Sequence, residues 1–222
     1  MKVYSIFESI DGEVNLYYQG RVATFVRLAG CNLQCAYCDT KYAQSSSFGR
    51  GMTAQEVFEE IKNFSPNKVT ITGGEPLMQR VELVKLLNLL YQSNYFVSIE
   101  TNGSLPLLKN DFFVPYVVDY KLPSSDMEFK MCESVFHDLT RRDFVKFVIS
   151  DKRDFFRAIE KMQYFKTEFL SEANFVFSPC QGTLRPKELV EWIQQYKLKD
   201  VIVNLQIHKI IWPDCGGKGG ER

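Results

Sequence analysis

The sequence predicts an α/β fold, specifically a partial (incomplete) TIM-like barrel of about six parallel strands. Short apolar, β-branched runs alternate with amphipathic stretches that carry helix-capping signals, and strands joined through helices pair in parallel with right-handed crossovers. Polar or glycine-rich segments follow the strands, which is where ligands bind in such folds. Because 222 residues supply only six or seven strands, a full eight-fold barrel of ~250 residues is too large.

The individual elements follow from local signals. Thr53, with Glu56 three residues later, forms a capping box that starts a helix running through Ile61. Pro186 marks the start of the last helix, over 188–196, because its fixed φ suits a first helical turn. Apolar periodicity predicts strands at 23–28, 68–72, 95–99, 116–120, 144–149, 174–177 and 201–204, and further helices at 81–91 and 151–164.

The composition favours one globular domain that acts on a small molecule. The domain is expected to span residues 1–222, with a flexible glycine-rich tail from about residue 213. Lys plus Arg and Asp plus Glu both number 27, without the basic excess of a nucleic-acid binder. The N-terminus does not resemble a signal peptide and no apolar stretch approaches a membrane span, so we expect a cytoplasmic protein with reduced thiols.

Three cysteines, Cys31, Cys35 and Cys38, have the spacing C-x3-C-x2-C. A [4Fe–4S] cube needs a ligand on each of four irons, usually a Cys thiolate. Three thiolates leave one iron open, which predicts a catalytic cluster rather than a closed electron carrier. A zinc site would use four ligands in close pairs, and both histidines, His137 and His208, lie far downstream and unpaired. Three other cysteines lack pair spacing and are expected to be packed or incidental thiols: Cys132, Cys180 and Cys215.

Six consecutive strands are followed by polar or glycine-rich segments. These segments are 30–31, 73–76, 100–103, 121–123, 150–151 and 178–182. Because the ligand of a parallel sheet or barrel lies at the carboxyl ends of the strands, all six are expected to surround one mouth. The cysteine loop then forms one wall of that mouth.

The cysteine loop, with Tyr37 before its last cysteine, resembles the signature of radical S-adenosylmethionine (SAM) enzymes. Residues 73–76, Gly-Gly-Glu-Pro, resemble the superfamily motif whose backbone receives the amino group of SAM. The resemblance implies a radical SAM core in which SAM chelates the open iron and is cleaved to a 5′-deoxyadenosyl radical that abstracts hydrogen from the substrate. Glycines permit a close backbone approach and Glu75 can accept from an ammonium, whereas the plainer interpretation of Gly73 and Gly74 is a turn.

Four blocks resemble the 7-carboxy-7-deazaguanine synthases: 7–13, 25–31, 38–40 and 205–212, the last with its Gln-x-His-Lys sequence. Asp11 stands where that family usually has Gln, and Val14 where it has Gly, which puts a substrate contact in question but not the reaction. The family converts 6-carboxy-5,6,7,8-tetrahydropterin to 7-carboxy-7-deazaguanine with loss of ammonia. This carbon–nitrogen lyase reaction belongs to the route to queuosine and other 7-deazapurines.

The resemblance also implies a set of site residues. Substrate contacts are expected from Ile10, Asp11, Gly12, Glu13, Arg27 and His208. SAM contacts are expected from Tyr37, Gly73, Gly74, Glu75, Glu100, Lys121 and Gln181. Thr40 is expected to bind Mg²⁺, and the three motif cysteines the cluster. A homodimer, reduced by a flavodoxin or ferredoxin, is implied as well.

Four of these roles have a physical basis and a plainer alternative. Arg27 presents a planar fork for a carboxylate, or forms a structural ion pair. Glu13 accepts hydrogen bonds from the guanidine-like edge of a pterin, or is a solvated loop acid. Thr40 offers the hard oxygen that Mg²⁺ prefers, or caps a loop. His208 contacts substrate or transfers a proton near neutral pH, or is a packed histidine.

Further alternatives concern one pair of charges and the whole function. Lys121 and Glu100, both at strand ends, bind a polar ligand or pair with each other. A glycyl-radical activating enzyme shares the cysteine spacing, but it would need a docking surface for a protein and neither Arg27 nor a Mg²⁺ loop. A non-catalytic iron–sulfur or zinc module leaves 73–76 and the other strand-end segments unexplained.

Overall fold

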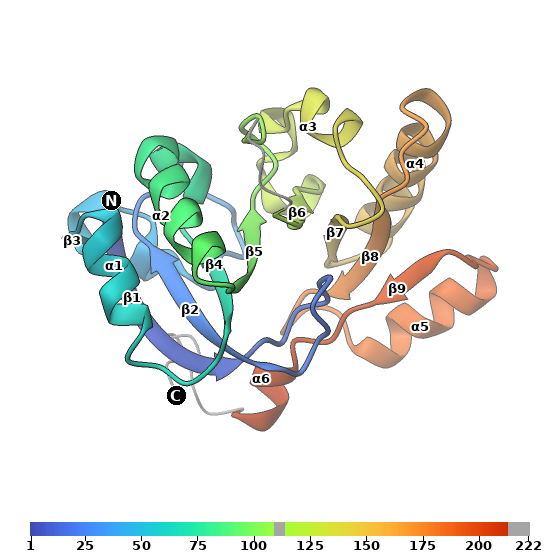
Figure 1. Cartoon of the computed structure of the whole chain (residues 1–222). Helices are drawn as coiled ribbons and strands as arrows, with labels where there is room; N and C mark the ends of the chain where they lie inside the picture. Colours follow the sequence, from blue (N-terminus) through green and yellow to red (C-terminus); the bar gives the residue numbers. More distant parts are fainter. Residues whose placement is uncertain (109–113, 213–222) are drawn as a thin grey trace.

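The computed structural model describes residues 1–108 and 114–212 and contains one sheet curved into an open arc (Figure 1). Seven strands pair in parallel: β2 (Val22–Leu28), β4 (Lys68–Gly73), β5 (Phe96–Thr101), β6 (Tyr116–Tyr120), β7 (Phe144–Ile149), β8 (Asn174–Pro179) and β9 (Val201–Val203). Two antiparallel strands, β1 (Lys2–Ile10) and β3 (Arg50–Gly51), extend the sheet beyond β2. In the described residues the strand order is β3-β1-β2-β4-β5-β6-β7-β8-β9. The open, mostly parallel arc confirms the predicted fold class.

Strand β1 is the main difference from the prediction. Its residues contain no long apolar run, and most of them are only half-buried. The strand forms because it pairs along its length with β2, from Val3 opposite Leu28 to Ile10 opposite Val22. That pairing depends on tertiary context, which overrides weak local β propensity.

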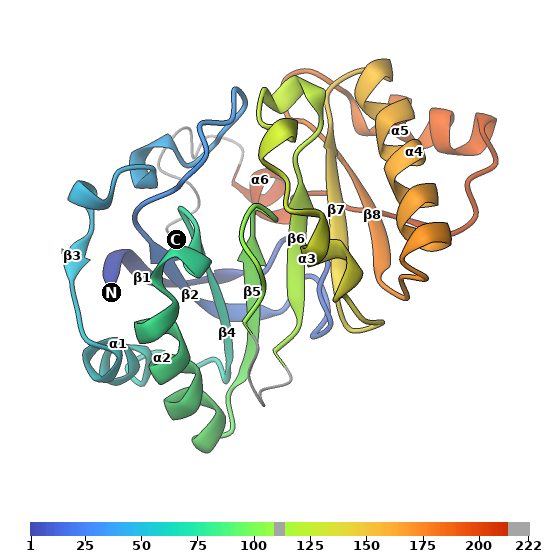
Figure 2. The ribbon, with the colours of Figure 1, turned by 90° about the horizontal axis from the view of Figure 1, so that it is seen from above.

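Helices cover the outer side of the arc (Figures 1 and 2). They are α1 (Ala54–Ile61), α2 (Arg80–Gln92), α3 (Glu133–His137), α4 (Lys152–Glu168) and α5 (Pro186–Gln195). The 3-10 turns are η1 (Lys41–Ala43), η2 (Ser46–Phe48), η3 (Pro76–Gln79), η4 (Pro123–Ser125) and η5 (Glu128–Lys130). The predicted capping box is present, because Thr53 Oγ1 accepts from Glu56 N at 3.2 Å and Glu56 Oε2 accepts from Thr53 N at 2.7 Å. The sequence signals therefore placed the four long helices to within a few residues of their ends.

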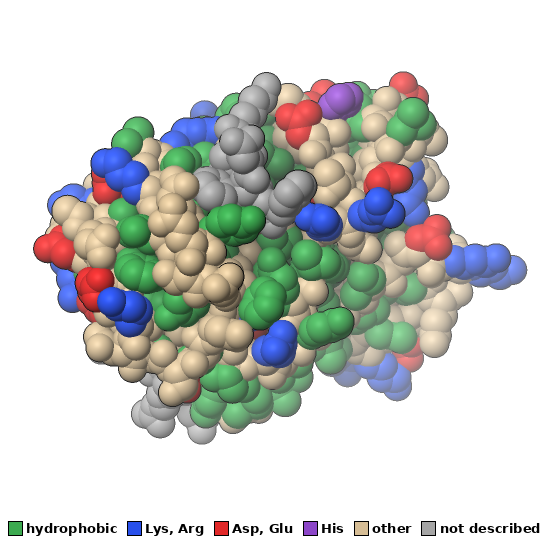
Figure 3. Space-filling model, in the orientation of Figure 1, with side chains coloured by type: hydrophobic (Ala, Val, Ile, Leu, Met, Phe, Trp, Pro, Cys, Tyr) green, Lys and Arg blue, Asp and Glu red, His purple; other side chains and the backbone are tan. Residues whose placement is uncertain are grey.

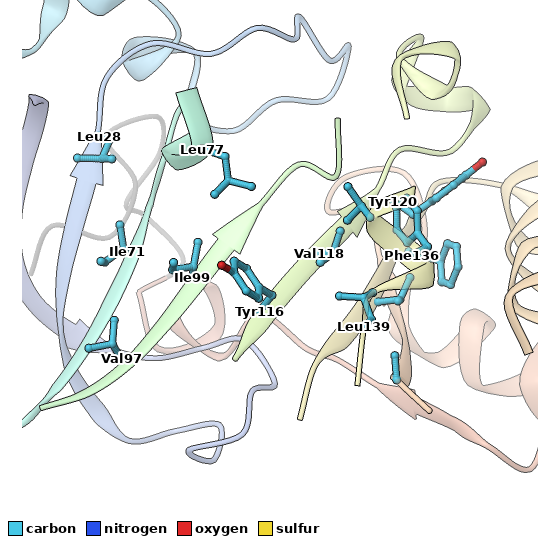
Figure 4. Close-up of a cluster of buried hydrophobic side chains, with 14 of the residues drawn as sticks. Leu28, Ile71, Leu77, Val97, Ile99, Tyr116, Val118, Tyr120, Phe136 and Leu139 are labelled. Atoms are coloured by element: carbon cyan, nitrogen blue, oxygen red, sulfur yellow. The ribbon is translucent and has the colours of Figure 1, made fainter. Parts of the chain in front are cut away.

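The hydrophobic core lies between the sheet and these helices. Alternate residues of the parallel strands point outward into it, as Ile71, Ile99 and Val118 do in Figure 4. Helix α2 contributes four fully or almost fully buried leucines: Leu83, Leu86, Leu87 and Leu90. Because side chains alternate along a strand, the other residues of each strand point to the inner face of the arc.

The short helix α6 (Ile207–Ile211) lies in the opening between the β1–β2 and β9 ends of the arc (Figure 1). The predicted flexible tail from about residue 213, with Cys215, lies outside the described residues, and the one-domain organisation stays a prediction. No helix within 1–108 or 114–212 is long and apolar enough to cross a bilayer. On the face in Figure 3, basic and acidic side chains are interspersed rather than gathered by sign.

Candidate functional site

The inner face of the arc carries both polar and apolar side chains and encloses a cavity of about 400 Å³. Its lining comes from the inward residues of neighbouring strands and from the loops at their carboxyl ends. The inward residues that line it include Thr72, Glu100, Asp119, Lys146 and Ser178. Five of the six predicted strand-end segments therefore contribute to one cavity. The sixth, 150–151, does not line it, because Asp151 caps the start of α4 instead.

The three motif cysteines all line this cavity. Backbone hydrogen bonds attach the start of their loop to the segment around η1, from Gly30 N to Ala43 O and from Cys31 N to Gln44 O, both 2.8 Å. The Cys31 sulfur accepts from Leu33 N at 3.5 Å and from Asn102 Nδ2 at 3.6 Å. Such donors stabilise a thiolate that ligates a cluster.

All five cysteines in the described ranges are free thiols. Burial raises the pKa of Cys31, and it raises the pKa of Cys35 to about 11, so ligation would displace protons from these thiols. In the same ranges, no three Cys, His, Asp or Glu side chains converge as ligands of one metal ion would. A cube takes each thiolate on a different iron, so the three cysteines that line the cavity are a suitable ligand set for such a cluster.

Gly73 and Gly74 pack directly on the end of β2 beside the cysteine loop. A Cβ atom on Gly73 would overlap the backbone of Leu28, and one on Gly74 would overlap that of Gly30. Gly74 N donates to Leu28 O and Glu75 N donates to Gly30 O, each at 2.8 Å. Only glycine permits two backbone segments to approach so closely, so Gly73 and Gly74 serve this packing as well as the turn.

Glu75 is fully buried and does not line the cavity. Its carboxylate accepts from Leu77 N at 2.9 Å, Thr101 Oγ1 at 2.8 Å and Asn102 N at 2.7 Å. Burial raises the pKa of this carboxyl group. The side chain therefore braces the end of β5 against the Gly-Gly turn, and its contact with an ammonium stays a prediction.

Four charged side chains form a chain of ion pairs in the lining of the cavity: Glu13, Lys121 and Lys146 are buried and Asp119 is half-buried. Lys146 lies 3.3 Å from Glu13 and 3.5 Å from Asp119, and Asp119 lies 3.2 Å from Lys121. Glu13 is 7% exposed and also accepts from Asn204 and Gln206, so it is not a solvated loop acid. Burial would lower the pKa of Lys146 and Lys121, but the neighbouring carboxylates raise it.

Glu100 lines the cavity without pairing with Lys121 in the described residues. Its carboxylate accepts from Thr72 Oγ1 at 2.7 Å. Burial raises the pKa of Glu100 to about 7, and the nearby Glu13 carboxylate adds to the effect. The group can therefore exchange a proton near neutral pH.

Arg27 presents a free donor to the cavity. Its guanidinium lies over the rings of Phe7 and Tyr42, 5.4 and 5.7 Å from their centroids. Within the described ranges it forms no salt bridge, and its buried Nε has no hydrogen-bond partner. An aromatic shelf that leaves the fork unpaired suits an incoming carboxylate better than a structural ion pair.

The C-terminal segment closes the open side of the arc over this site. Gln19 Nε2 donates to Leu205 O at 2.7 Å, and Lys209 Nζ lies 2.8 Å from Asp39 of the cysteine loop. His208 packs against Gly12 so closely that a Cβ there would collide with the imidazole. Burial lowers the pKa of His208, which favours its neutral form.

Thr40 precedes η1 and lines the cavity, but its hydroxyl does not cap that turn. Its Oγ1 lies 3.6 Å from the Cys38 sulfur. The plainer alternative of a loop cap is therefore wrong.

The cavity brings together every predicted site residue except Glu75. Several polar residues of its lining were not predicted as site residues: Asp39, Asp119, Lys146, Gln206 and Lys209, while Asn102 was predicted only as part of the segment 100–103. Two of them could have been predicted from the sequence, because Asp119 and Lys146 are charged residues at inward positions of otherwise apolar strands.

Comparisons with known proteins agree with this geometry. Residues 26–121 match the family model described as the Radical SAM superfamily. A 7-carboxy-7-deazaguanine synthase of Clostridium acetobutylicum is 41% identical over 95% of this chain and 96% of its own length. One of Koribacter versatilis is 37% identical over 98% of this chain and all of its own. The crystal structure of QueE from Escherichia coli superposes with a TM-score of 0.72 at 20% identity, covering 91% of this chain and 93% of QueE.

Proposed function

The chain belongs to the 7-carboxy-7-deazaguanine synthase family of radical SAM enzymes, and we propose how its cavity performs that reaction. The reaction converts 6-carboxy-5,6,7,8-tetrahydropterin to 7-carboxy-7-deazaguanine with loss of ammonia. The observation that carries the assignment to this cavity is that three free cysteines line it together with a half-buried arginine that has no ion-pair partner among residues 1–108 and 114–212.

Arg27 would bind the carboxylate of the pterin through its planar fork, with the aromatic shelf holding the guanidinium in orientation. Glu13 would accept from the amine edge of the same ring system. The Glu13 carboxylate is already held by Lys146, Asn204 and Gln206. Its side chain would therefore lose little further conformational entropy when the substrate binds. Ile10, Gly12 and His208 would complete the pocket around the ring.

The donor set of the cavity fits a [4Fe–4S] cluster and SAM. Cys31, Cys35 and Cys38 would hold three irons, with the N–H groups beside Cys31 stabilising its thiolate. When bound, the cluster and SAM supply the radical that abstracts hydrogen from the substrate.

The remaining cavity residues would bind SAM or support the groups that bind it. Gly73 and Gly74 would accept the ammonium of SAM at their backbone, and Glu75 would hold that turn from behind. Tyr37, Glu100, Lys121 and Gln181 also line the cavity and would contact the rest of SAM. Glu100 is suited to hold or release a proton beside the reacting centre.

Mg²⁺ is part of the proposal, with Thr40 as its ligand. The hydroxyl is not used as a cap and lies at the edge of the cavity beside the cysteine loop, which supports a hard-oxygen site. We also propose a homodimer of single-domain chains in the cytoplasm, reduced by a flavodoxin or ferredoxin.

The deciding experiment is an anaerobic turnover assay. The protein is reconstituted with iron and sulfide, reduced, and incubated with SAM, Mg²⁺ and 6-carboxytetrahydropterin while products are separated by mass-resolved chromatography. Many turnovers of 7-carboxy-7-deazaguanine per SAM consumed are expected. 5′-Deoxyadenosine without that product would retain the radical chemistry and reject the substrate, and a full cluster with neither product would reject both. Thr40→Ala tests the metal, because it should weaken the dependence of turnover on Mg²⁺.

A further inference from the structure

Lys68 is a buried lysine that the proposed reaction does not use. It is the first residue of β4, it points to the inner face of the arc, and only 1% of its surface is exposed. Lysine is almost never fully buried without a partner, because desolvating an ammonium is costly. A lysine in this place therefore needs a specific anionic partner.

That partner is Asp11, which is also 1% exposed and lines the cavity. Lys68 Nζ pairs with Asp11 Oδ2 and donates to Asn15 Oδ1 at 2.9 Å. Thr70 Oγ1 donates to the same Asp11 oxygen at 2.7 Å. The second carboxylate oxygen, Oδ1, accepts only a long contact of 3.4 Å from Glu13 N among the described residues.

The backbone of Asp11 is held as firmly as its side chain. Asp11 N donates to Arg21 O at 2.8 Å, and Gly20 N donates to Asp11 O at 2.7 Å. The residues that follow, Gly12 and Glu13, contact His208 and Lys146. Asp11 is thus the anchor of the turn 10–13, which carries most of the predicted substrate contacts on this side of the cavity.

The pair lies at the amino ends of the parallel strands, opposite the cysteines at their carboxyl ends. It therefore closes the floor of the cavity beneath the place where the substrate ring would lie. Removing one partner of a buried ion pair leaves an uncompensated charge, which is strongly destabilising to the local arrangement.

We propose that Lys68 is a positioning residue for substrate binding, which it serves by fixing Asp11 and with it the turn 10–13. The inference rests on the proposed function, since the effect is on the binding of 6-carboxytetrahydropterin.

The test is a double-mutant cycle of Lys68→Met and Asp11→Asn in the reconstituted holoenzyme. Each single variant should raise the KM for 6-carboxytetrahydropterin by roughly ten-fold or more, while kcat changes less than about three-fold. The double variant should raise KM by less than the product of the two single effects, because neither unpaired charge remains. Glu60→Gln is the matched control, because it breaks the exposed Arg50–Glu60 ion pair away from the cavity and should leave KM unchanged.

If the pair is only structural, each variant will lower the midpoint of thermal unfolding without changing KM, and that result would overturn the proposal. A double variant whose rise in KM equals the product of the two single rises would overturn it as well. If Lys68→Met does not fold, Asp11→Asn and the charge-conserving Lys68→Arg carry the test, with KM raised in the first and largely retained in the second. Equal KM values for these two variants and the unmodified protein would then reject the idea. Absence of product from the unmodified protein would instead reject the proposed function.

Discussion

Replacing Glu100 by Gln should stabilise the cluster-free protein at alkaline pH and have little effect in acid. The carboxyl group has a pKa of about 7 when folded, raised by burial, against an ordinary value of 4.5. Below about pH 4.5 the Glu100 carboxyl group is protonated in both the folded and the unfolded protein. Between the two values the folded state keeps a proton that the unfolded chain has released, so stability falls as pH rises, and above pH 7 the whole cost is present.

Taken alone, the difference between the folded and the unfolded pKa of Glu100 lowers the free energy of unfolding by ~3 kcal/mol at about pH 8. Water in the open cavity screens part of it, so Glu100→Gln should gain ~1–3 kcal/mol over the unmodified protein at about pH 8 and far less at about pH 5. Gln can still accept from Thr72, so the hydrogen bond survives the change.

The assay is reversible urea unfolding at both pH values. Glu160→Gln, on the exposed side of α4 with 64% of its side chain accessible, controls for loss of a surface carboxylate and should change stability by less than about 0.5 kcal/mol. A gain for Glu100→Gln that is the same at both pH values would refute the reasoning, because it would show that ionisation of this group is not what costs stability.

Three further predictions address the cavity. Arg27→Met should raise the KM for 6-carboxytetrahydropterin by roughly 10- to 100-fold by removing a charge-assisted bond, and it should not change the affinity for an analogue lacking the carboxylate; an equal loss for both ligands would contradict this role. Gly74→Ala should destabilise the protein by about 3 kcal/mol, because the added Cβ would overlap the backbone of the cysteine loop. Gly51→Ala is the control in the same urea titration, because a Cβ has room there and the free energy of unfolding should hardly change. Cys35→Ala should lose the absorbance of the cluster and all product formation, while Cys180→Ala, a buried cysteine of the same cavity outside the motif, should keep both; a full cluster in Cys35→Ala would remove it from the ligand set.

The fold class and most of the cavity could be predicted from the sequence because their signals are local. The capping box at Thr53 and Glu56, the apolar runs of the strands and the cysteine spacing all involve residues close together along the chain. The rule that strand ends share one edge then assembled distant segments into a single mouth without knowledge of any contact.

Contacts between distant segments were decided only by the tertiary structure. The strand β1 forms through antiparallel pairing with β2, and α6 closes an opening that exists only once the arc has formed. Glu75 faces the end of β5 instead of the cavity because buried donors there satisfy its carboxylate.

The charged residues of the interior show most clearly what the sequence determined and what only the tertiary structure decided. The sequence by itself determined that Glu13, Asp119 and Lys146 are present, and that thiols, glycines and acids follow the strands. It did not determine which charges pair, because an ionised group in the interior takes whichever partner offsets its lost hydration. That choice depends on three-dimensional proximity, which is why the pairing of Lys68 with Asp11 emerged only from the structure.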